Sequence, residues 1–334
     1  MTQKHTTPEH ELLDAYKKDA DEEQFLEWFN GILAPYEQPL YKQLDGTLHA
    51  TYYVIGVPRS GTTLANQLLA HVLGVGYVNH LIASMWQAPV MGVHLSQKLL
   101  PDAEEIQFQS KFGRTNRITE PHEFGYFWSE RLGYQNLMQP SPSEIDNVNW
   151  TELRKVIQNM SYASGKPFLF KPLMLVWYLD ELIKHCPESR FLWIDRDPLQ
   201  VALSLLHMRE EMTGSQTNWL SLKPSDYNSL KQCTPYEQVA GQIARIHSAL
   251  EHAWEKYGDR HIVRVSYEDF CTAPQAAVDK FLALNPGHGT AAKQIRECPP
   301  EFKIHKRSID HTSSLKTLEY ALEKAFEHTS ETNS

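Results

Sequence analysis

Residues 52–64 read YYVIGVPRSGTTL, and this stretch decides the fold. Its first part, YYVIGV, is a short run of aromatic and β-branched residues, typical of a strand buried on both faces. Pro58 ends the run, and TLANQLLAHVL follows with the periodicity of a helix. A loop between a buried strand and a helix can turn several backbone N–H groups toward one point, beside the positive end of the helix dipole. The stretch therefore predicts an anion-binding loop.

The side chains of this loop suit an oxyanion. Gly61 allows close backbone approach, and Arg59 supplies a fixed positive charge. Ser60, Thr62 and Thr63 add hydroxyl donors. Gly56 and Gly61 keep the spacing of a nucleoside-triphosphate loop, but Thr62 stands where that loop has its lysine. A kinase needs this lysine against the phosphates of its nucleotide, so the loop points to a ligand with fewer phosphate charges here.

Three further strand patterns follow along the chain. They are KPFLFK (166–171), SRFLWID (189–195) and HIVRVSY (261–267), each followed by a helical pattern. Alternating strands and helices predict an α/β fold with a P-loop-like parallel sheet, helices on both faces, and ligands beyond the carboxyl ends of the strands. After KPFLFK, one helix is expected over LMLVWYLDELIKHC (173–186), and the last core helix over 274–284.

A second signal lies in RFLWIDRDPLQVALSLL (190–206), where Arg196 directly follows a strand. Ser204 lies eight positions later, two turns into the next helix. Both side chains can reach one phosphate near the sheet edge. Asp195 ends the same strand as the magnesium-binding aspartate of a kinase would, so a P-loop kinase remains an alternative.

Three regions are expected. Residues 1–50 predict a helical N-terminal arm that packs on the surface and is ended by Pro35 and Pro39. Residues 51–284 form the α/β core. Residues 285–334 form a polar tail, and one interpretation is that this tail covers the ligand site. Its end, EKAFEHTSETNS, is expected to be frayed.

Composition limits the classes of function. The net charge of −9 argues against nucleic-acid binding but allows one local anion pocket. The four cysteines are scattered, which favours a reducing compartment and no zinc site or disulfide framework. The N-terminal segment is polar, and no run approaches the roughly 20 apolar residues of a membrane span. A cytoplasmic protein is expected.

PRSGTTL after a strand resembles the 5′-phosphosulfate-binding loop of sulfotransferases that use 3′-phosphoadenosine 5′-phosphosulfate (PAPS). Arg196 with Ser204 resembles the family's 3′-phosphate-binding pair, and FLFKP (168–172) and VRVSYEDF (263–270) resemble two more of its elements. The likeness spans residues 52–284 and is nearer to bacterial and tyrosylprotein-type members than to phenol-type ones. It implies sulfuryl transfer from PAPS, without a metal, to a hydroxyl or amine of a small molecule, glycan, lipid or peptide.

The resemblance also implies roles for single residues. Arg59 and residues 60–63 would hold the 5′-phosphosulfate, and Arg196 and Ser204 the 3′-phosphate. Tyr267, in the late strand–helix element, would join the nucleotide site. Lys171 would lie near the bridging oxygen and stabilise the departing nucleotide. Arg307, in the basic cluster KIHKRS (303–308), would belong to a C-terminal loop over the nucleotide, although a solvated charge run is the alternative.

A general base must take the proton of the acceptor. His80 follows the first helix, near the position where tyrosylprotein-type members carry a glutamate. Glu123 and Glu120, in ITEPHEFGYFW (118–128), are the alternatives.

Apolar residues around them either line an acceptor pocket or belong to the core: Met85, Trp86, Phe124, Tyr126, Phe127 and Trp128. A non-catalytic nucleotide-binding protein is the remaining alternative. Neither the acceptor nor the oligomeric state is indicated.

Overall fold

Strand β1 (Thr51–Ile55) lies at the centre of a five-stranded parallel sheet with the order β2-β3-β1-β4-β5. The computed structural model describes residues 12–44, 48–100, 106–134, 136–284, 290–308 and 312–332. The other strands are β2 (Gly76–Tyr77), β3 (Phe168–Phe170), β4 (Ser189–Asp195) and β5 (Ile262–Ser266). All five residues of β1 are buried, as expected for a strand covered on both faces. The parallel α/β sheet predicted from the sequence is confirmed.

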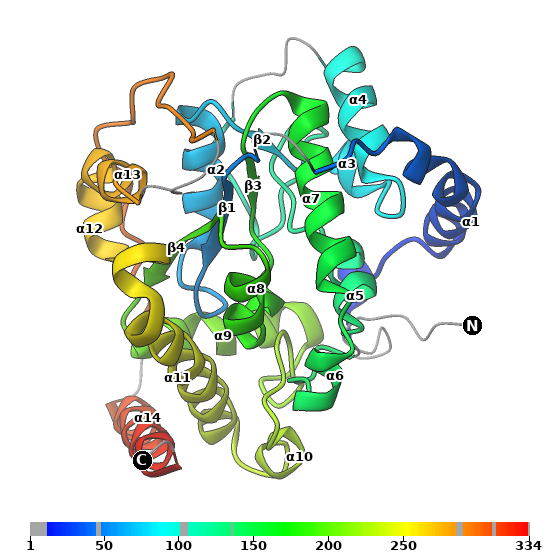
Figure 1. Ribbon diagram of the computed structural model, residues 1–334. Helices are drawn as coiled ribbons and strands as arrows, with labels where there is room; N and C mark the ends of the chain where they lie inside the picture. The colour runs from blue at the N-terminus through cyan, green and yellow to red at the C-terminus, as the bar shows by residue number, and fades with distance from the viewer. Residues whose placement is uncertain are drawn as a thin grey trace.

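Helices cover both faces of the sheet (Figure 1). On one face, Tyr52 and Val54 pack against α2 (Thr62–Val72), α12 (Tyr267–Thr272) and α13 (Pro274–Leu282). On the other face, Tyr53 stacks between Phe170 and Phe191, with ring centroids 5.6 and 4.9 Å apart. This second core is closed by α7 (Trp150–Ser164), α8 (Leu179–His185), α9 (Pro198–Thr213) and α11 (Pro235–His261). Alternate residues of β1 thus pack into two separate hydrophobic cores, one on each face of the sheet.

Two details of the central elements differ from the sequence-based expectation. β2 has only two residues, too few to give a recognisable strand pattern. The helix expected over 173–186 is divided into the 3-10 helix η4 (Leu173–Trp177) and α8. Tyr178 breaks the run because its backbone leaves the helical region, with φ −120° and ψ 7°.

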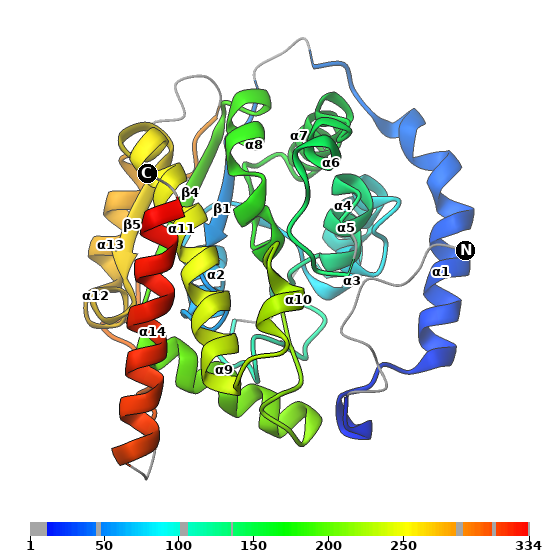
Figure 2. The ribbon, with the colours of Figure 1, turned by 90° about the horizontal axis from the view of Figure 1, so that it is seen from below.

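The N-terminal arm is helical and extends along an outer edge of the molecule (Figure 2). It comprises η2 (Asp14–Tyr16), α1 (Ala20–Glu37) and η3 (Gln38–Leu40). Pro35 lies inside α1 and does not end it, contrary to expectation. The inner side of α1 is fixed by two buried polar residues. Asn30 donates to the Ser84 carbonyl, and Glu37 accepts from the first amides of α4 (Pro89–Leu99).

The remaining short helices surround the sheet's second face or link the larger elements. They are α3 (His80–Ala83), α5 (Gly125–Leu132), α6 (Pro142–Asp146) and α10 (Tyr227–Leu230). Within the described ranges, no helix is long and apolar enough to cross a membrane.

The C-terminal region ends in a long helix, α14 (Thr312–Thr332), instead of the frayed tail expected. Figure 2 shows α14 running beside α11. Leu318 is fully buried, and Ala321 and Leu322 are nearly so. The apolar residues of a polar sequence therefore gather on one face and complete the second core. Residues 333 and 334 lie outside the described residues.

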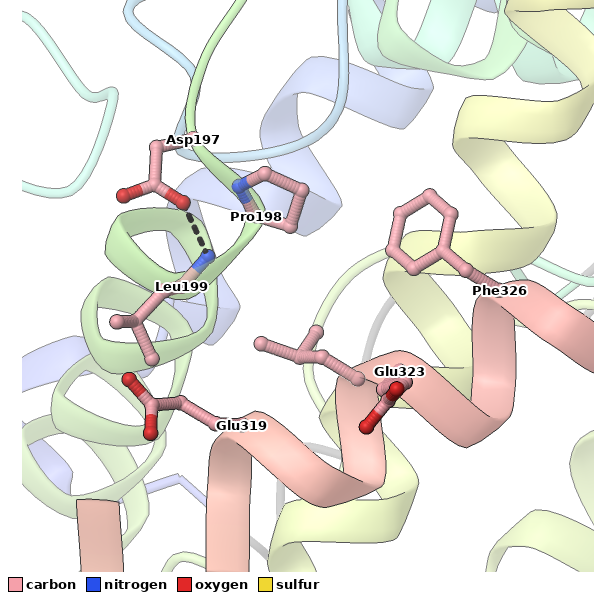
Figure 3. Close-up of a pocket in the computed structure, with 7 residues that line it drawn as sticks. Asp197, Pro198, Leu199, Glu319, Glu323 and Phe326 are labelled. Atoms are coloured by element: carbon pink, nitrogen blue, oxygen red, sulfur yellow. Dashed lines mark hydrogen bonds between the residues drawn. The ribbon is translucent and has the colours of Figure 1, made fainter. Parts of the chain in front are cut away.

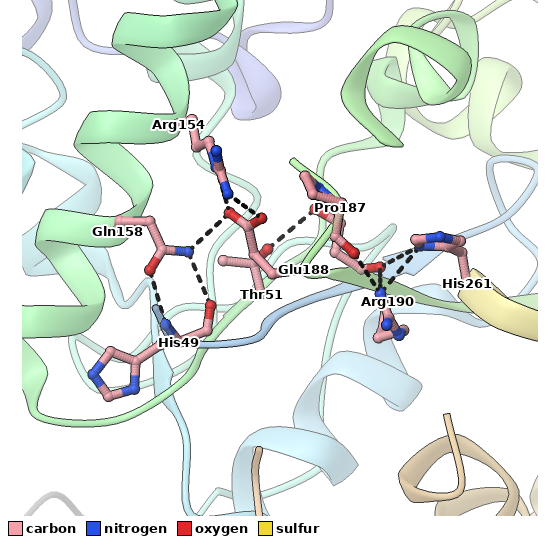
Figure 4. Close-up of polar contacts among 9 residues, drawn as sticks. His49, Thr51, Arg154, Gln158, Pro187, Glu188, Arg190 and His261 are labelled. Carbon is pink, nitrogen blue, oxygen red and sulfur yellow. Dashed lines mark hydrogen bonds and ion pairs between the residues drawn. The ribbon is translucent and has the colours of Figure 1, made fainter. Parts of the chain in front are cut away.

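The amino ends of the strands carry a partly buried ion pair, drawn in Figure 4. Arg154 donates two hydrogen bonds of 2.9 Å to the Glu188 carboxylate, which also accepts from Gln158. Gln158 in turn bonds both backbone polar groups of His49, just before β1. These carboxylate, guanidinium and amide groups satisfy one another, although His49 Nδ1 has no partner. The opposite, carboxyl ends of the strands hold the residues with unsatisfied charge.

Candidate active site

The loop between β1 and α2 has the backbone of an anion-binding turn. Arg59 and Gly61 both adopt positive φ angles, 76° and 104°, and the Ser60 amide donates to the Val57 carbonyl at 3.0 Å. A side chain on Gly61 would collide with the Tyr267 ring, 2.5 Å from the position of its Cβ. Residue 61 must therefore be glycine for two reasons: its positive φ angle, and the Tyr267 ring that packs where a Cβ would lie.

Arg196 joins the end of β4 to this loop. Its Nη1 donates to the carbonyl oxygen of Arg59 at 3.1 Å, and its Nη2 donates to the His305 carbonyl. The guanidinium lies over the Tyr267 ring, 4.3 Å from the centroid. Arg59 Nε donates to Ser204 Oγ at 3.2 Å. Arg59, from the loop, therefore contacts both Arg196 and Ser204, which were predicted to bind the other end of the ligand. The contact arises because β1 and β4 are adjacent parallel strands.

Three guanidinium groups gather here. Burial and the charges of Arg307 and Arg196 lower the pKa of Arg59 to about 10. Burial and the charge of Arg196 also lower the pKa of Arg307. In the part of the chain that the structure describes, no carboxylate forms an ion pair with any of the three. Glu123 attracts Arg59 through space, but the three like charges still repel one another, and an anion bound between them would relieve that repulsion.

Two buried polar atoms beside the cluster have no hydrogen-bond partner: Ser60 Oγ and Arg196 Nε. Ser60 is only 1% exposed, so solvent does not satisfy its hydroxyl. Buried polar groups without partners are rare in folded proteins, and at a helix N-terminus they mark a place where a ligand supplies the missing bonds. The hydroxyl and the guanidinium nitrogen therefore fit an oxyanion.

Arg307 enters the site from the C-terminal segment. Its backbone amide donates to Gln200 Oε1 at 2.8 Å, and Gln200 Nε2 donates back to the Arg307 carbonyl at 3.2 Å. This pair of bonds fixes the segment to α9. Within the basic cluster, Arg307 is partly buried, whereas Lys303 and Lys306 are exposed. The cluster therefore divides into one residue at the site and two solvated lysines.

Lys171 and Glu123 form an ion pair next to the loop. Lys171 directly follows β3 and is only 3% exposed, and its ammonium group also donates to Thr63 Oγ1 at 3.0 Å. Pro172 restricts Lys171 to an extended backbone, which carries the side chain beyond the strand end. The Glu123 carboxylate, 40% exposed, lies on the open side of this pair. An acid–base pair of residues is thus in contact with the anion-binding loop.

His80, the first residue of α3, has its own hydrogen-bond partner. Its Nε2 lies 2.9 Å from Thr115 Oγ1, which itself donates to the Pro121 carbonyl. This hydroxyl can only accept from His80, so His80 carries its proton on Nε2. Its ring faces that of His122 at 4.7 Å, and burial lowers its pKa. Within the described residues, His80 forms no hydrogen bond with the 59–63 loop.

His122 was not a candidate from the sequence, but it sets the position of Glu123. Its Nδ1 accepts the amide of Phe124 at 3.0 Å, which closes a tight turn around Glu123. Phe124 holds a left-handed backbone, with φ 60° and ψ 39°. Burial and the neighbouring His80 lower the pKa of His122 to about 4, so the ring stays a neutral acceptor.

Glu120 has a different environment from the other two base candidates. It is 3% exposed, and its carboxylate accepts from Gln67 Nε2 and the Gln107 amide, both at 2.9 Å. Both oxygens are occupied, and they join α2 to the segment after residue 105. This is the arrangement of a structural residue.

The N-terminal arm returns to the open side of the site. Tyr16 packs edge-on against Phe112 at 6.3 Å, and the Phe112 ring lies against the Arg59 guanidinium at 5.6 Å. Lys18 lies over the Tyr126 ring, 4.0 Å from its centroid. The segment before α1 therefore contacts Tyr126 and also Phe112, which lies against Arg59. Of the six apolar candidates for an acceptor pocket, only Tyr126 is partly exposed, and the other five are core residues.

Asp195 is not available to a metal ion. Its Oδ2 accepts from Arg264 Nε at 3.0 Å and Nη2 at 2.6 Å, and its Oδ1 lies 3.5 Å from His247 Nε2. Within the described residues, no three His, Cys, Asp or Glu side chains gather as metal ligands. The kinase-like role of Asp195 loses its support.

A groove of about 470 Å³ lies between the start of α9 and α14, as Figure 3 shows. Leu199, Leu322 and Phe326 are its apolar lining, and the carboxylates of Asp197, Glu319 and Glu323 surround it. Three negative charges oppose the entry of a multiply charged anion. This groove is therefore a poor site for such an anion.

The family model for the sulfotransferase family matches residues 52–284, the whole span of the sheet and the loop. The chain belongs to the sulfotransferase family. Among solved structures, the sulfotransferase STF9 from Mycobacterium avium is similar, with 15% identity, a TM-score of 0.50, and 76% of this chain and 67% of that chain covered. STF1 from Mycobacterium tuberculosis H37Rv has 14% identity, a TM-score of 0.44, and coverages of 78% and 72%. No curated protein matches this chain.

Membership identifies this sulfotransferase as a transferase, and the structural likeness confirms its fold. Sequence reasoning missed three residues around the anion site: Gln200, Phe112 and His122. Gln200 lies four residues after Arg196 on a helical pattern and was open to inference. Phe112 lies in a loop without periodicity, so no sequence signal marks its contact with Arg59.

Proposed function

We propose that this sulfotransferase moves a sulfuryl group from PAPS to a hydroxyl or amine acceptor, by in-line displacement with a general base. The observation that carries the proposal is the group of three guanidiniums, Arg59, Arg196 and Arg307, without a paired carboxylate. PAPS has anions on both sides of its ribose, and the cluster offers several positive charges, with Arg196 over the Tyr267 ring. A donor with this charge distribution would remove the mutual repulsion of the three arginines.

The two ends of the donor have different partners in this proposal. The backbone amides at the start of α2, with Ser60, Thr62, Thr63 and Arg59, would bind the 5′-phosphosulfate. Arg196 and Ser204 would bind the 3′-phosphate, and Arg307 would approach it from the C-terminal segment. The unpartnered Ser60 Oγ and Arg196 Nε support the fit, since each gains a bond.

Lys171 and Glu123 would carry the chemistry. Lys171 leaves Glu123 and donates to the oxygen that joins the phosphate to the sulfur, which stabilises negative charge there as the S–O bond breaks. Glu123 is then free to take the proton of the acceptor as its oxygen or nitrogen bonds to sulfur. Glu123 replaces His80 as the preferred base, because its carboxylate touches Lys171 whereas His80 bonds Thr115.

The first experiment is thermal stabilisation by ligand, which follows mass action on the folded state. We expect 3′,5′-adenosine bisphosphate to raise the melting temperature in the absence of magnesium, and ATP with magnesium to do little. The opposite order would favour a kinase. The second experiment is transfer of labelled sulfate from PAPS across an acceptor library. Donor binding without transfer to any acceptor would leave a non-catalytic nucleotide-binding protein.

A further inference from the structure

The outer face of α1 carries a stripe of exposed apolar side chains. Phe25 is 53% exposed, Trp28 62%, Ile32 45% and Tyr36 65%, and Leu40 follows at 42%. The spacing of three to four residues places the first four on one side of the helix. Scattered exposed apolar residues are ordinary, but a continuous row with three aromatic side chains marks an interaction surface. This outer stripe comprises Phe25, Trp28, Ile32, Tyr36 and Leu40.

The stripe is separate from the contacts that hold α1 to the molecule. Those contacts are made by the opposite side of the helix, through Asn30 and Glu37. Gly31 lies beside the stripe, and a Cβ at this position would meet no atom within 4 Å. Glycine inside a helix costs about 1 kcal/mol relative to alanine. Nothing within the described chain requires it, whereas the close approach of another helix would.

We propose that the outer stripe pairs with the same stripe of a second copy of this chain, with the two α1 helices antiparallel. A two-fold axis near Ile32 places Trp28 of each copy opposite Tyr36 of the other. It also brings Glu22, at the acidic start of α1, toward the end of the partner's arm that carries Lys42, whose ammonium lies 6.0 Å from the Tyr162 ring centroid. Both residues are exposed. The ends of the pair are therefore complementary in charge, and its centre is apolar.

The exposed apolar area of the outer stripe is large enough for a contact with a second copy of the chain. Large side chains cover about 150–250 Å² each, so five that are half exposed offer about 500 Å² of apolar surface per copy. Two copies bury about 1,000 Å², the lower bound for a specific interface. A lipid surface is a poorer occupant, because residues 19–41 contain six acidic residues and no lysine or arginine. Helices that lie on membranes carry lysine and arginine on their polar face.

The test is the oligomeric state of the full chain, measured by size exclusion with light scattering from about 1 to 100 µM. We expect a dimer. Trp28→Glu with Ile32→Glu should make the protein monomeric over this range. The matched control is Tyr320→Glu, which changes an aromatic residue that is 61% exposed on α14 and should leave the dimer intact. Circular dichroism checks that each variant is folded.

A charge exchange tests the antiparallel geometry. Glu22→Lys and Lys42→Glu should each weaken the dimer about two- to fivefold, and the double variant should recover it. A wild-type chain that is monomeric at every concentration, a dimer that survives the stripe substitutions, or a double variant weaker than both single ones would overturn the proposal. A monomer that sediments with neutral lipid vesicles would do so too. None of these readouts depends on donor binding or turnover.

Discussion

The guanidinium of Arg196 donates to the backbone carbonyl of Arg59 at 3.1 Å, so the ends of β4 and β1 are tied at the point where charge accumulates. The contact fixes the loop from outside its own sequence. It also orients Arg196, whose Nε remains buried without a partner. Arg196 thus holds the loop between β1 and α2 in place, and its Nε remains able to donate one more hydrogen bond.

Arg196→Ala should weaken the binding of 3′,5′-adenosine bisphosphate about 10- to 150-fold, the effect of losing about 1.5–3 kcal/mol of charged hydrogen bonding. Calorimetric titration without magnesium measures it. Arg196→Lys is the matched control, because it keeps the charge and loses the planar fork. Its affinity should lie between those of the wild type and the alanine variant. Equal affinity in all three proteins would remove Arg196 from the donor site.

Glu123→Gln should lower turnover about 100-fold or more and leave donor affinity within about threefold, since general bases contribute 10²–10⁴ in rate. The variant keeps the size of the side chain and loses its proton affinity. Labelled-sulfate transfer and bisphosphate titration give the two readouts. His80→Ala is the comparison, and we expect it to keep most of the turnover. The reverse ranking would return the base to His80.

Glu120→Gln should act on stability and not directly on turnover. The buried carboxylate accepts one bond from Gln67 and one from the Gln107 amide, and an amide side chain cannot accept on both of its heavy atoms. We expect the free energy of unfolding to fall by about 1–3 kcal/mol, measured by urea denaturation. The remaining folded protein should turn over normally at low temperature. A large loss of turnover at unchanged stability would make Glu120 the base.

The sequence predicted the centre of the fold better than its periphery. β1 and β3 are apolar runs, and β4 contains one, because these strands are buried on both faces. β5, at the sheet edge, is only partly buried and still shows a recognisable strand pattern. α14 was missed because Leu318 and Leu322 are few among polar neighbours, and the face they complete belongs to α11, far away in sequence. Pro35 did not end α1, since a proline near the end of a helix removes only one of its last bonds.

The candidate site, too, was predicted only in part from the sequence. Arg59, Arg196 and Ser204 could be grouped from the sequence, because adjacent parallel strands bring their carboxyl ends to one edge. The choice between His80, Glu120 and Glu123 could not be made, since it depends on hydrogen-bond partners from distant segments. Thr115 engages His80, and Gln67 engages Glu120. Only the three-dimensional arrangement leaves Glu123 beside Lys171.

Leu318→Ala should destabilise the protein by about 2–4 kcal/mol, because the fully buried side chain leaves a cavity between α14 and the core. Tyr320→Ala, on the exposed face of the same helix, should change the free energy of unfolding by about 0.5 kcal/mol or less. Thermal and urea denaturation compare the two variants. If both are neutral, α14 does not contribute to the core and the tail is frayed after all.

His122→Leu should lower turnover about tenfold or more without weakening donor binding, because the turn that directs Glu123 toward Lys171 loses its acceptor. His122→Asn should recover much of the loss, since an asparagine oxygen can accept the amide two residues ahead. A purely space-filling role for His122 predicts the opposite ranking of leucine and asparagine. Sulfate transfer and bisphosphate titration separate these outcomes.

The same residue should give the wild type a pH-dependent stability. The pKa of His122 is lowered from 6.5 to about 4, so between these values the unfolded chain binds a proton that the folded chain does not. Stability from this group is therefore full above pH 6.5 and declines as the pH falls toward 4, by at most about 2 kcal/mol after allowance for solvent screening. His122→Asn should remove this part of the acid sensitivity, seen as a smaller drop in melting temperature between pH 7 and 5. An identical drop in both proteins would mean that His122 is protonated in the folded state, and that its ring does not serve as the acceptor of the Phe124 amide.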